Sequence, residues 1–332
     1  MTIATSPPLS PEGFRHEALL YDGDTSFLKG TVPFIESGLA GDEAVMVVVS
    51  ARKIELLKEA LSQQGSGVAF ADMDNVGLNP ARIIPAWRAF VEENSRQGRP
   101  MRGIGEPIWP DRGAAELAEC HHHEALLNVA FTDAKQFWLL CPYDTAALGP
   151  GVIERMAVNH PFLSDGERVS ESEAYNYEQV VSQPFLEPLP DPPPEATALS
   201  FTASTLRQLR AWVSSRATDA GMSKARTDDL VLAVNEIASN SVRHGGGSGD
   251  IRLWEDDRAI TCDVFDTGHI RHPLAGRQLP VRGQDSGRGL WIANQVCDLV
   301  QIRSSPEGTV VRLRQSKTGP SAANPQAIQL AI

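Results

Sequence analysis

Three features of membrane and secreted proteins are missing from this sequence of 332 residues. It has no run of eighteen apolar residues, which a membrane-spanning helix would need. Its first residues, 1–8, lack the basic segment and following apolar segment of a secretory signal. Cysteine is scarce, since only four are present and they show no paired spacing. We therefore expect a cytoplasmic protein with reduced thiols and no membrane partner.

Negative charge exceeds positive charge, and the excess is unevenly placed. The formal net charge is −12, of which residues 1–196 carry −15 and residues 197–332 carry +3. An acidic front half is a poor partner for nucleic acid, so we expect no direct nucleic-acid binding. The length, with 42% hydrophobic residues, allows two domains that each have a core.

A proline-rich segment marks the boundary between these two domains. Residues 183–197 repeat proline, which fixes φ and removes backbone donors. We interpret the segment as a semi-rigid linker between a domain at 14–182 and a domain at 198–315. Residues 1–13 and 316–332 show no periodicity and are predicted to be disordered.

Buried strands alternate with helices in the first domain. The β-branched run at 43–50 suits a strand that is buried on both faces. Such alternation predicts a three-layer α/β domain with a mainly parallel sheet. The expected strands are 43–50, 68–70, 101–106 and 136–141, and the expected helices are 25–39, 52–63, 80–96 and 114–131.

The second domain has a different order of elements. Two helices come first, and a later helix lies between two pairs of strands. This order predicts an α+β domain with helices on one face of a mixed sheet. The expected helices are 204–220, 223–244 and 287–297, and the expected strands are 250–255, 259–265, 299–303 and 309–314.

One predicted helix of the second domain carries a polar stripe beside its buried face. Glu236, Asn240 and His244 are four residues apart each time, so they share a side of the helix. A carboxylate and a carboxamide so placed can hold a metal ion or water against phosphates. The alternative for this stripe is a solvated helix face.

Two glycine-containing motifs follow the stripe. Asp266-Thr267-Gly268 ends a predicted strand, where the carboxylate can accept a hydrogen bond from an exocyclic amine and the glycine permits close approach of a ligand. A long loop, 269–286, has the length of a lid. It leads into Gly287-Arg288-Gly289-Leu290, whose backbone N–H groups at a helix N-terminus can meet phosphate oxygens. A plain turn and a capping turn are the alternatives.

Taken in order, these motifs resemble those of a GHKL (Bergerat-fold) ATPase domain, in the branch of bacterial anti-sigma-factor serine kinases. The resemblance covers residues 200–314 and matches the N box at 236–245, the G1 box at 266–268 and the G2 box at 287–290. Thr309 stands where that family has its adenine-side threonine.

The GHKL resemblance implies ATP and Mg²⁺ as cofactors. It implies that Asn240 binds Mg²⁺, that Glu236 is the general base and that Asp266 reads the adenine amine. His244 either adds a contact to the nucleotide or has a surface role. The remaining nucleotide contacts that it implies are Gly245, Gly268, Gly287, Arg288, Gly289, Leu290 and Thr309.

Three activities are open to such a domain, because the same fold serves several. A kinase acting on a serine or threonine of a STAS-type anti-sigma-factor antagonist, with or without sequestration of a sigma factor, fits the proline linker best. An ATP-gated binding switch without transfer is the second. A histidine kinase is the third, although no helical hairpin with a phospho-accepting histidine can be fitted before residue 204. The family resemblance also suggests a homodimer.

Candidate sensor residues gather in the first domain. Cys120 and His123 are three residues apart and Glu119 and His123 four apart on the predicted helix 114–131, so each pair can share a face. Thiolate, imidazole and carboxylate at this spacing could bind a transition metal or a reactive small molecule. A core cysteine with a polar face of histidines is the alternative.

Residues 14–165 resemble the MEDS sensory domain, from the segment 14–21 through Glu119-Cys120 and His123-Glu124 to the segment 141–144. That family is similar to degenerate RecA-type ATPases and is thought to sense small ligands. Residues 21–26 contain no Gly-Lys-Ser/Thr, which makes ATP hydrolysis by this domain doubtful. The resemblance implies a small-molecule signal, with candidate sensor residues His16, Glu106, Glu119, Cys120 and His123.

Overall fold

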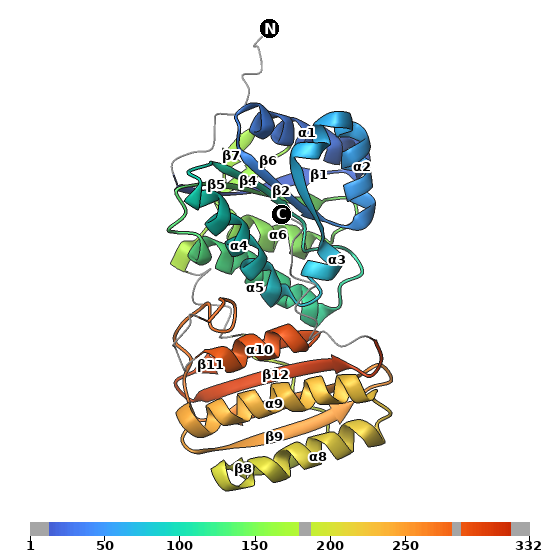
Figure 1. The fold of residues 1–332 in the computed structure, drawn as a ribbon, viewed down its shortest axis with the longest axis vertical. Helices are drawn as coiled ribbons and strands as arrows, with labels where there is room; N and C mark the ends of the chain where they lie inside the picture. The colour runs from blue at the N-terminus through green and yellow to red at the C-terminus, as the bar shows by residue number, and fades with distance from the viewer. Residues whose placement is uncertain (1–12, 179–186, 281–286, 320–332) are drawn as a thin grey trace. The chain divides into compact units, whose positions relative to one another are not determined.

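The computed structural model describes residues 13–178, 187–280 and 287–319, with the side chain of Gln63 also left out. The chain divides into two compact units, with the division between residues 181 and 182 (Figure 1). Each unit has its own sheet and core. The segments expected to be disordered, 1–13 and 316–332, lie mostly outside the described residues. The expectation is wrong for Gly13, which begins the first strand, and for Ser316, which ends the last.

A seven-stranded sheet runs through the first unit, in the order β3-β2-β4-β5-β1-β6-β7 (Figure 1). Neighbouring strands are parallel except for β6 and β7 at one edge. The predicted mainly parallel sheet is confirmed. The strands are β1 Gly13–Tyr21, β2 Ala44–Val49, β3 Val68–Asp72, β4 Met101–Gly105, β5 Gln136–Asp144, β6 Phe162–Ser164 and β7 Val169–Glu171.

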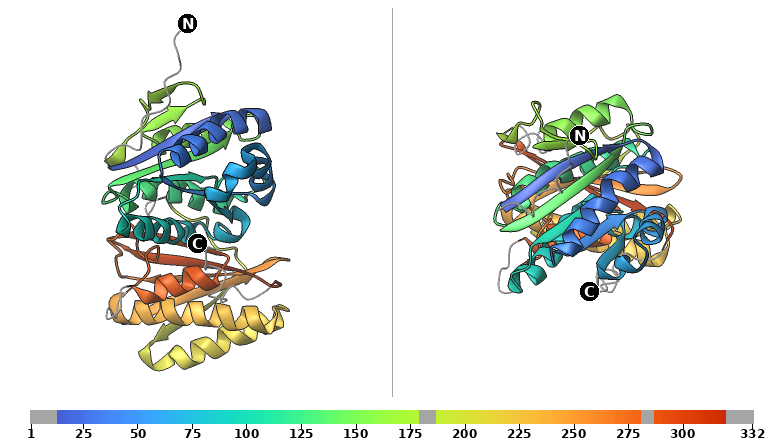
Figure 2. Two further views of the ribbon diagram at one scale, coloured as in Figure 1. Left: turned by 45° about the horizontal axis from the view of Figure 1, so that its top comes forward. Right: turned by 90° about the horizontal axis from the view of Figure 1, so that it is seen from above.

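Helices cover both faces of this sheet, as Figure 2 shows. One face packs against α1 and α2 through a cluster that includes Phe27, Ile35 and Leu57. The opposite face packs against α4 and the end of α5, where Trp87 and Phe131 contact Phe137 of β5. The three layers follow from strands buried on both sides, since every residue of β2 and β4 is buried. The helices are α1 Gly23–Ala40, α2 Ala51–Leu61, α3 Met73–Val76, α4 Ile83–Arg96, α5 Ala114–Ala130 and α6 Pro150–Asn159, with 3₁₀ turns at Ser62–Gly67 and Pro80–Arg82.

A buried ion pair fastens β4 to the segment before β2. The guanidinium of Arg102, which is 0% exposed, donates to Glu43 through Nε (2.7 Å) and Nη2 (3.2 Å) and to the carbonyl of Phe34 through Nη1 (3.1 Å). Gly38 leaves room for this side chain, because a Cβ there would lie 2.9 Å from Arg102 Cδ. Both charges are therefore paired inside the unit.

We predict that Arg102→Met destabilises the first unit by about 3–5 kcal/mol, because it leaves the Glu43 carboxylate buried without its cation. Chemical unfolding of the full chain, followed by circular dichroism, measures the change. The control is Arg99→Met, which removes an exposed ion pair to Asp42 and should cost about 1 kcal/mol or less. Equal losses in the two variants would contradict the prediction.

The second unit has a five-stranded sheet in the order β11-β12-β10-β9-β8. All neighbouring strands are antiparallel, so the predicted mixed sheet is wrong. The strand β8, Thr197–Thr202, was missed because it lies where the linker ends, although Leu199 and Phe201 alternate with polar or small residues. The other strands are β9 Ser248–Glu255, β10 Ala259–Asp266, β11 Leu299–Ser305 and β12 Gly308–Ser316.

Three helices cover one face of this sheet (Figures 1 and 2). They are α8 Leu206–Asp219, α9 Lys224–His244 and α10 Arg288–Val296. Ser223 caps α9, as its residue type predicts, by accepting a hydrogen bond from the N–H of Arg226. Leu230, Val234 and Ile237 of α9 enter the core, and the polar stripe of that helix lies beside this buried face.

The described part of the proline-rich segment, 187–196, lies against the other face of the same sheet. Arg303 donates to the carbonyl of Glu187 (2.6 Å) and Arg312 donates to the carbonyl of Pro190 (2.8 Å). Segment and sheet enclose a cavity of about 870 Å³ that contains none of the motif residues. The segment therefore has side-chain partners within the second unit.

Candidate functional site

A cavity of about 360 Å³ opens in the second unit where α9, β10, β12 and α10 meet. This volume is within the range of small-molecule sites. Residues from all of the sequence motifs line it, together with apolar side chains that suit a flat ring. The lining residues are Ile237, Asn240, His244, Gly245, Asp266, Gly268, His269, Ile270, Gly287, Leu290, Thr309 and Val311.

The carboxylate at the end of β10 is held in place from two directions. The backbone N–H of Gly268 donates to Asp266 Oδ1 (2.7 Å), and the hydroxyl of Ser241 donates to Asp266 Oδ2 (2.6 Å). Ser241 belongs to the buried side of α9, so the helix orients the carboxylate as well as covering the sheet. Asp266 keeps further lone pairs with which it can accept a hydrogen bond from a ligand amine.

A chain of hydroxyl groups supports the loop that follows β10. Thr309 donates to the carbonyl of Gly268 (2.9 Å), and its Oγ1 lies 2.7 Å from Ser304 Oγ. Ser304 in turn accepts from the N–H of Ile270 (2.8 Å). Sequence reasoning named Thr309 as a site residue but not Ser241 or Ser304. Nothing in the sequence shows that Ser241 of α9 meets Asp266, or that Ser304 of β11 meets the loop after β10.

Glycines allow close approach of backbone to side chain at two points of the site. A Cβ on Gly245 would lie 2.3 Å from Asp266 Cγ, and a Cβ on Gly289 would lie 2.7 Å from Asn240 Nδ2. Either methyl group would displace a motif side chain. These two residues therefore have a steric reason to be glycine.

Only part of the polar stripe on α9 lines the cavity. Asn240 and His244 line it, whereas Glu236 is not among the lining residues and lies one turn earlier on α9. The start of α10 crosses this turn, since a Cβ on Gly289 would lie 3.2 Å from the carbonyl oxygen of Glu236. Gly287 caps α10 with φ +94°, a conformation that glycine adopts readily, and the exposed Arg288 follows it.

The predicted lid, 269–286, is described as far as residue 280. Part of it packs against α10: Asn294 donates to the carbonyl of Gly276 (2.9 Å), and Leu274 is buried. Asp285 and Ser286, which precede the G2 glycine, lie outside the described residues.

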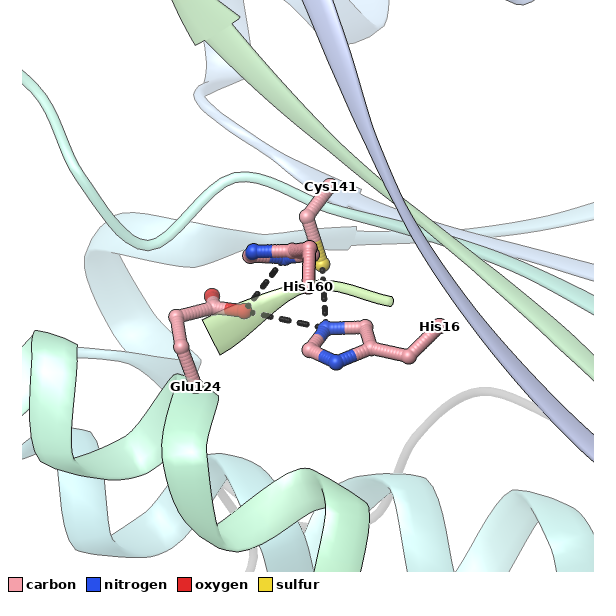
Figure 3. A group of neighbouring side chains, drawn as sticks. All are labelled: His16, Glu124, Cys141 and His160. Atoms are coloured by element: carbon pink, nitrogen blue, oxygen red, sulfur yellow. Dashed lines mark hydrogen bonds and ion pairs between the residues drawn. The ribbon is translucent and has the colours of Figure 1, made fainter. Parts of the chain in front are cut away.

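The first unit does not bring the five candidate sensor residues together. His16 lies with Glu124, Cys141 and His160 in a buried cluster (Figure 3). Among the described residues this is the one group of three or more His, Cys, Asp or Glu side chains close enough to share a metal ion. Glu119, Cys120 and His123, which the sequence offered as one possible set of metal ligands, are not such a group.

The reason is the orientation of α5. Glu124 points to β1 and β5, whereas Cys120 donates to the carbonyl of Pro107 (3.3 Å) and Glu119 lies 3.4 Å from His122. Helical spacing shows which residues share a face of α5, but the sheet decides which of them meets His16.

Glu106 belongs to a different group, at the ends of β1 and β4. Its carboxylate accepts hydrogen bonds from Tyr21 (2.6 Å) and from Lys53 (2.6 and 2.7 Å). Burial raises the pKa of Glu106 despite the nearby ammonium of Lys53. Burial, with the Glu106 charge, also raises the pKa of Tyr21. A doubly wound sheet commonly binds ligands at this end of its strands.

The pKa values of the side chains in the buried cluster around His16 are strongly shifted. Burial, together with the His160 ring, lowers the pKa of His16 to about 4. Burial alone would raise the pKa of Glu124, but its contacts with the rings of His16 and His160 outweigh burial and hold that pKa below its usual range. Burial raises the pKa of Cys141 well above that of a free thiol.

All four cysteines are free and buried, and we predict that none reacts with Ellman's reagent in the native chain. Burial raises the pKa of Cys120 to about 12, so only about one thiol in 10⁴ would be ionised at pH 8. Absorbance should show no rapid release in native buffer and four equivalents after unfolding. Rapid labelling of Cys120 in the native chain would contradict the prediction and would restore it as a reactive sensor.

Comparison with protein families agrees with the division into two units. Residues 15–161 match the MEDS family, described as a methanogen/methylotroph, DcmR sensory domain. Residues 199–315 match the histidine kinase-like ATPase domain family. No curated protein gives a significant match. Among the described residues, no helix is both long enough and apolar enough to cross a membrane.

Proposed function

We propose that this chain, which joins a MEDS domain to a histidine kinase-like ATPase domain, is an ATP-dependent regulatory protein kinase. Its substrate is a serine or threonine of another protein, of the STAS-type anti-sigma-factor antagonist class. The MEDS domain, which we take to be RecA-like on the basis of its mainly parallel sheet, binds the small-molecule signal that controls the kinase.

A single observation carries the nucleotide part of the proposal. Residues of four separated segments, represented by Asn240, Asp266, Gly287 and Thr309, line one cavity of about 360 Å³. Ile237, Leu290 and Val311 supply apolar surface in that cavity, against which we expect the adenine ring to pack. Asp266, oriented by Ser241 and Gly268, supplies the acceptor for the exocyclic amine.

The other end of the cavity suits phosphates. Gly287 and the following N–H groups open α10, where the helix dipole favours anions. Asn240 offers an amide oxygen, which is a ligand type of Mg²⁺. When bound, Mg-ATP supplies the phosphoryl group and the metal charge that stabilises its transfer. The residues of this chain bind the nucleotide, orient it and, through Glu236, accept the proton of the attacking hydroxyl.

The segment before the domain favours a substrate on another protein. Between residues 187 and 196 the described chain contains no helix, and Arg303 and Arg312 bind this segment to the sheet. A histidine kinase needs a helical hairpin with its phospho-accepting histidine at this place. The described residues offer none, so we propose transfer to a partner's hydroxyl.

The test incubates the full chain with radiolabelled Mg-ATP and a purified STAS-type antagonist. We expect label on the antagonist that survives acid and is removed by base, as a phosphoserine ester would be. An antagonist variant with alanine in place of its acceptor serine is the control and should stay unlabelled. Acid-labile label on the chain itself would indicate a histidine kinase. ATP binding without any transfer would overturn the kinase and leave a nucleotide-gated switch.

A further inference from the structure

Four potential metal ligands converge inside the first unit, from four segments far apart in the sequence (Figure 3). They are His16 of β1, Glu124 of α5, Cys141 of β5 and His160 directly after α6. Each residue is at most 1% exposed. Their ligand atoms all lie within 4.8 Å of one another. A set of two imidazoles, a carboxylate and a thiol is an unusual content for the interior of a domain.

Three of the six distances between these atoms are close to those of a coordination sphere. Glu124 Oε2 lies 3.1 Å from His16 Nε2 and 3.2 Å from His160 Nε2, and Cys141 Sγ lies 3.4 Å from His16 Nε2. A tetrahedral ion with bonds of about 2.0–2.3 Å separates its ligand atoms by roughly 3.3–3.6 Å. These three contacts already suit an ion, and the remaining ligand atoms, all within 4.8 Å of one another, would move closer to complete the sphere.

A hydrogen bond to a residue outside the cluster determines which ring nitrogen of His160 faces the other three side chains. His160 Nδ1 lies 2.9 Å from the carbonyl oxygen of Met156, which can only accept. The Nδ1 atom therefore carries a hydrogen, and the lone pair of a neutral ring is on Nε2. That lone pair faces the carboxylate of Glu124.

His16 has the same arrangement through a different partner. Its Nδ1 lies 3.2 Å from Asn128 Oδ1. The amide of Asn128 is oriented by its own donor, since Nδ2 donates to the carbonyl of Asn159 (2.8 Å). Asn128 therefore accepts from His16 Nδ1, and the Nε2 lone pair of His16 also faces Glu124.

With both rings neutral, two imidazole lone pairs face one carboxylate oxygen, and a cation between them would remove this repulsion. A cation at the centre binds all of these lone pairs at once, and the hydrogen bonds to Met156 and Asn128 are the outer-shell contacts that metal-binding histidines usually make. Imidazole and thiolate ligands exclude Ca²⁺ and Mg²⁺, which prefer oxygen, and favour zinc and its transition-metal neighbours.

We propose that His16, Glu124, Cys141 and His160 form a closed, four-coordinate site for one divalent transition-metal ion of the zinc type. On binding, the Cys141 thiol releases its proton to solvent and the sulfur coordinates the ion as thiolate. With four protein ligands the site has the composition of a structural centre rather than of a catalytic one. It ties α5 and the end of α6 to β1 and β5.

The test titrates the chelator-treated full chain with Co²⁺ and then with Zn²⁺. We expect one equivalent of Co²⁺ to bind, with the intense visible bands of tetrahedral cobalt and a near-ultraviolet thiolate-to-cobalt band. Zn²⁺ should displace it and bleach both. Cys141→Ser should lose the thiolate band and bind about 100-fold more weakly, whereas the equally buried Cys120→Ser should keep the band and an affinity within about three-fold.

Two further measurements keep the proposal testable if Cys141→Ser does not fold. Asn128→Ala, which removes the outer contact to His16 and the bond to Asn159 but no proposed ligand, should keep the thiolate band and weaken binding by about 10–100-fold. Chelation should also lower the melting temperature of the unmodified chain and leave that of His160→Gln unchanged. No binding of either metal by the unmodified chain, or a thiolate band that depends on Cys120 instead, would overturn the proposal. ATP binding by the same samples reports separately on the second unit.

Discussion

Replacement of Glu236 by Gln is expected to lower phosphoryl transfer by a factor of about 10²–10⁴, the usual contribution of a general base. ATP affinity should change by no more than about three-fold, because Glu236 is not among the residues that line the nucleotide cavity. The carboxylate lies one helical turn before Asn240 on α9, beneath the start of α10. Glutamine keeps the shape of the side chain and removes its ability to accept a proton.

Quantitative transfer assays and calorimetric titration with ATP measure the two effects on the same samples. The control is Asp228→Asn, on the same helix, whose exposed carboxylate pairs with Lys224 (2.6 Å) far from the cavity. It should transfer phosphate at the normal rate. Normal transfer by Glu236→Gln would remove Glu236 from the mechanism. A parallel loss of ATP binding would instead make it a binding residue.

Asp266→Asn is expected to weaken ATP binding by about 10–100-fold. A hydrogen bond to a charged acceptor contributes about 1.5–3 kcal/mol, which corresponds to such a change. The asparagine oxygen can still accept from Gly268, and its amide nitrogen can donate to Ser241 Oγ, because that hydroxyl also lies 3.2 Å from the carbonyl of Ile237. The local fold is therefore kept while the charge is lost.

The preference for ATP over GTP tests the role of Asp266 more directly than the affinity for ATP does. Adenine presents an exocyclic amine, whereas guanine presents a carbonyl at the same place, so the carboxylate should favour ATP over GTP. We expect the variant to lose most of this preference in competition titrations, and the exposed Asp250→Asn on β9 to keep it. An unchanged preference in Asp266→Asn would assign adenine recognition to other groups.

Much of the second unit was predictable from local patterns. The stripe of Asn240 and His244 follows from helical spacing, and the Asp266-Thr267-Gly268 turn follows from a strand that ends in a flexible residue. These residues line one cavity, together with Gly287 and Thr309. Local spacing is informative here because each motif lies at the end of one element, and the ends of adjacent elements meet.

The details that depend on pairing between distant strands were not predictable. Every strand of the second sheet is antiparallel to its neighbours, although we expected a mixed sheet. The direction of a strand depends on the connections between strands rather than on residue type. Ser304, which lies beside Thr309, reaches Ile270 of the motif loop only because β12 pairs with β10. Hydrophobic patterns show that a strand is buried, but they do not name its neighbour.

The first unit shows most clearly which features the sequence determines and which depend on the tertiary structure. The sequence by itself determined that buried strands alternate with helices and that α5 carries histidines, carboxylates and a cysteine. Only the tertiary structure decided that Glu124 rather than Glu119 meets His16, and that Cys141 rather than Cys120 supplies the thiol. The physical reason is the parallel pairing of β1 with β5, in which Ala18 lies opposite Cys141 and so brings Cys141 beside His16 from 125 residues away.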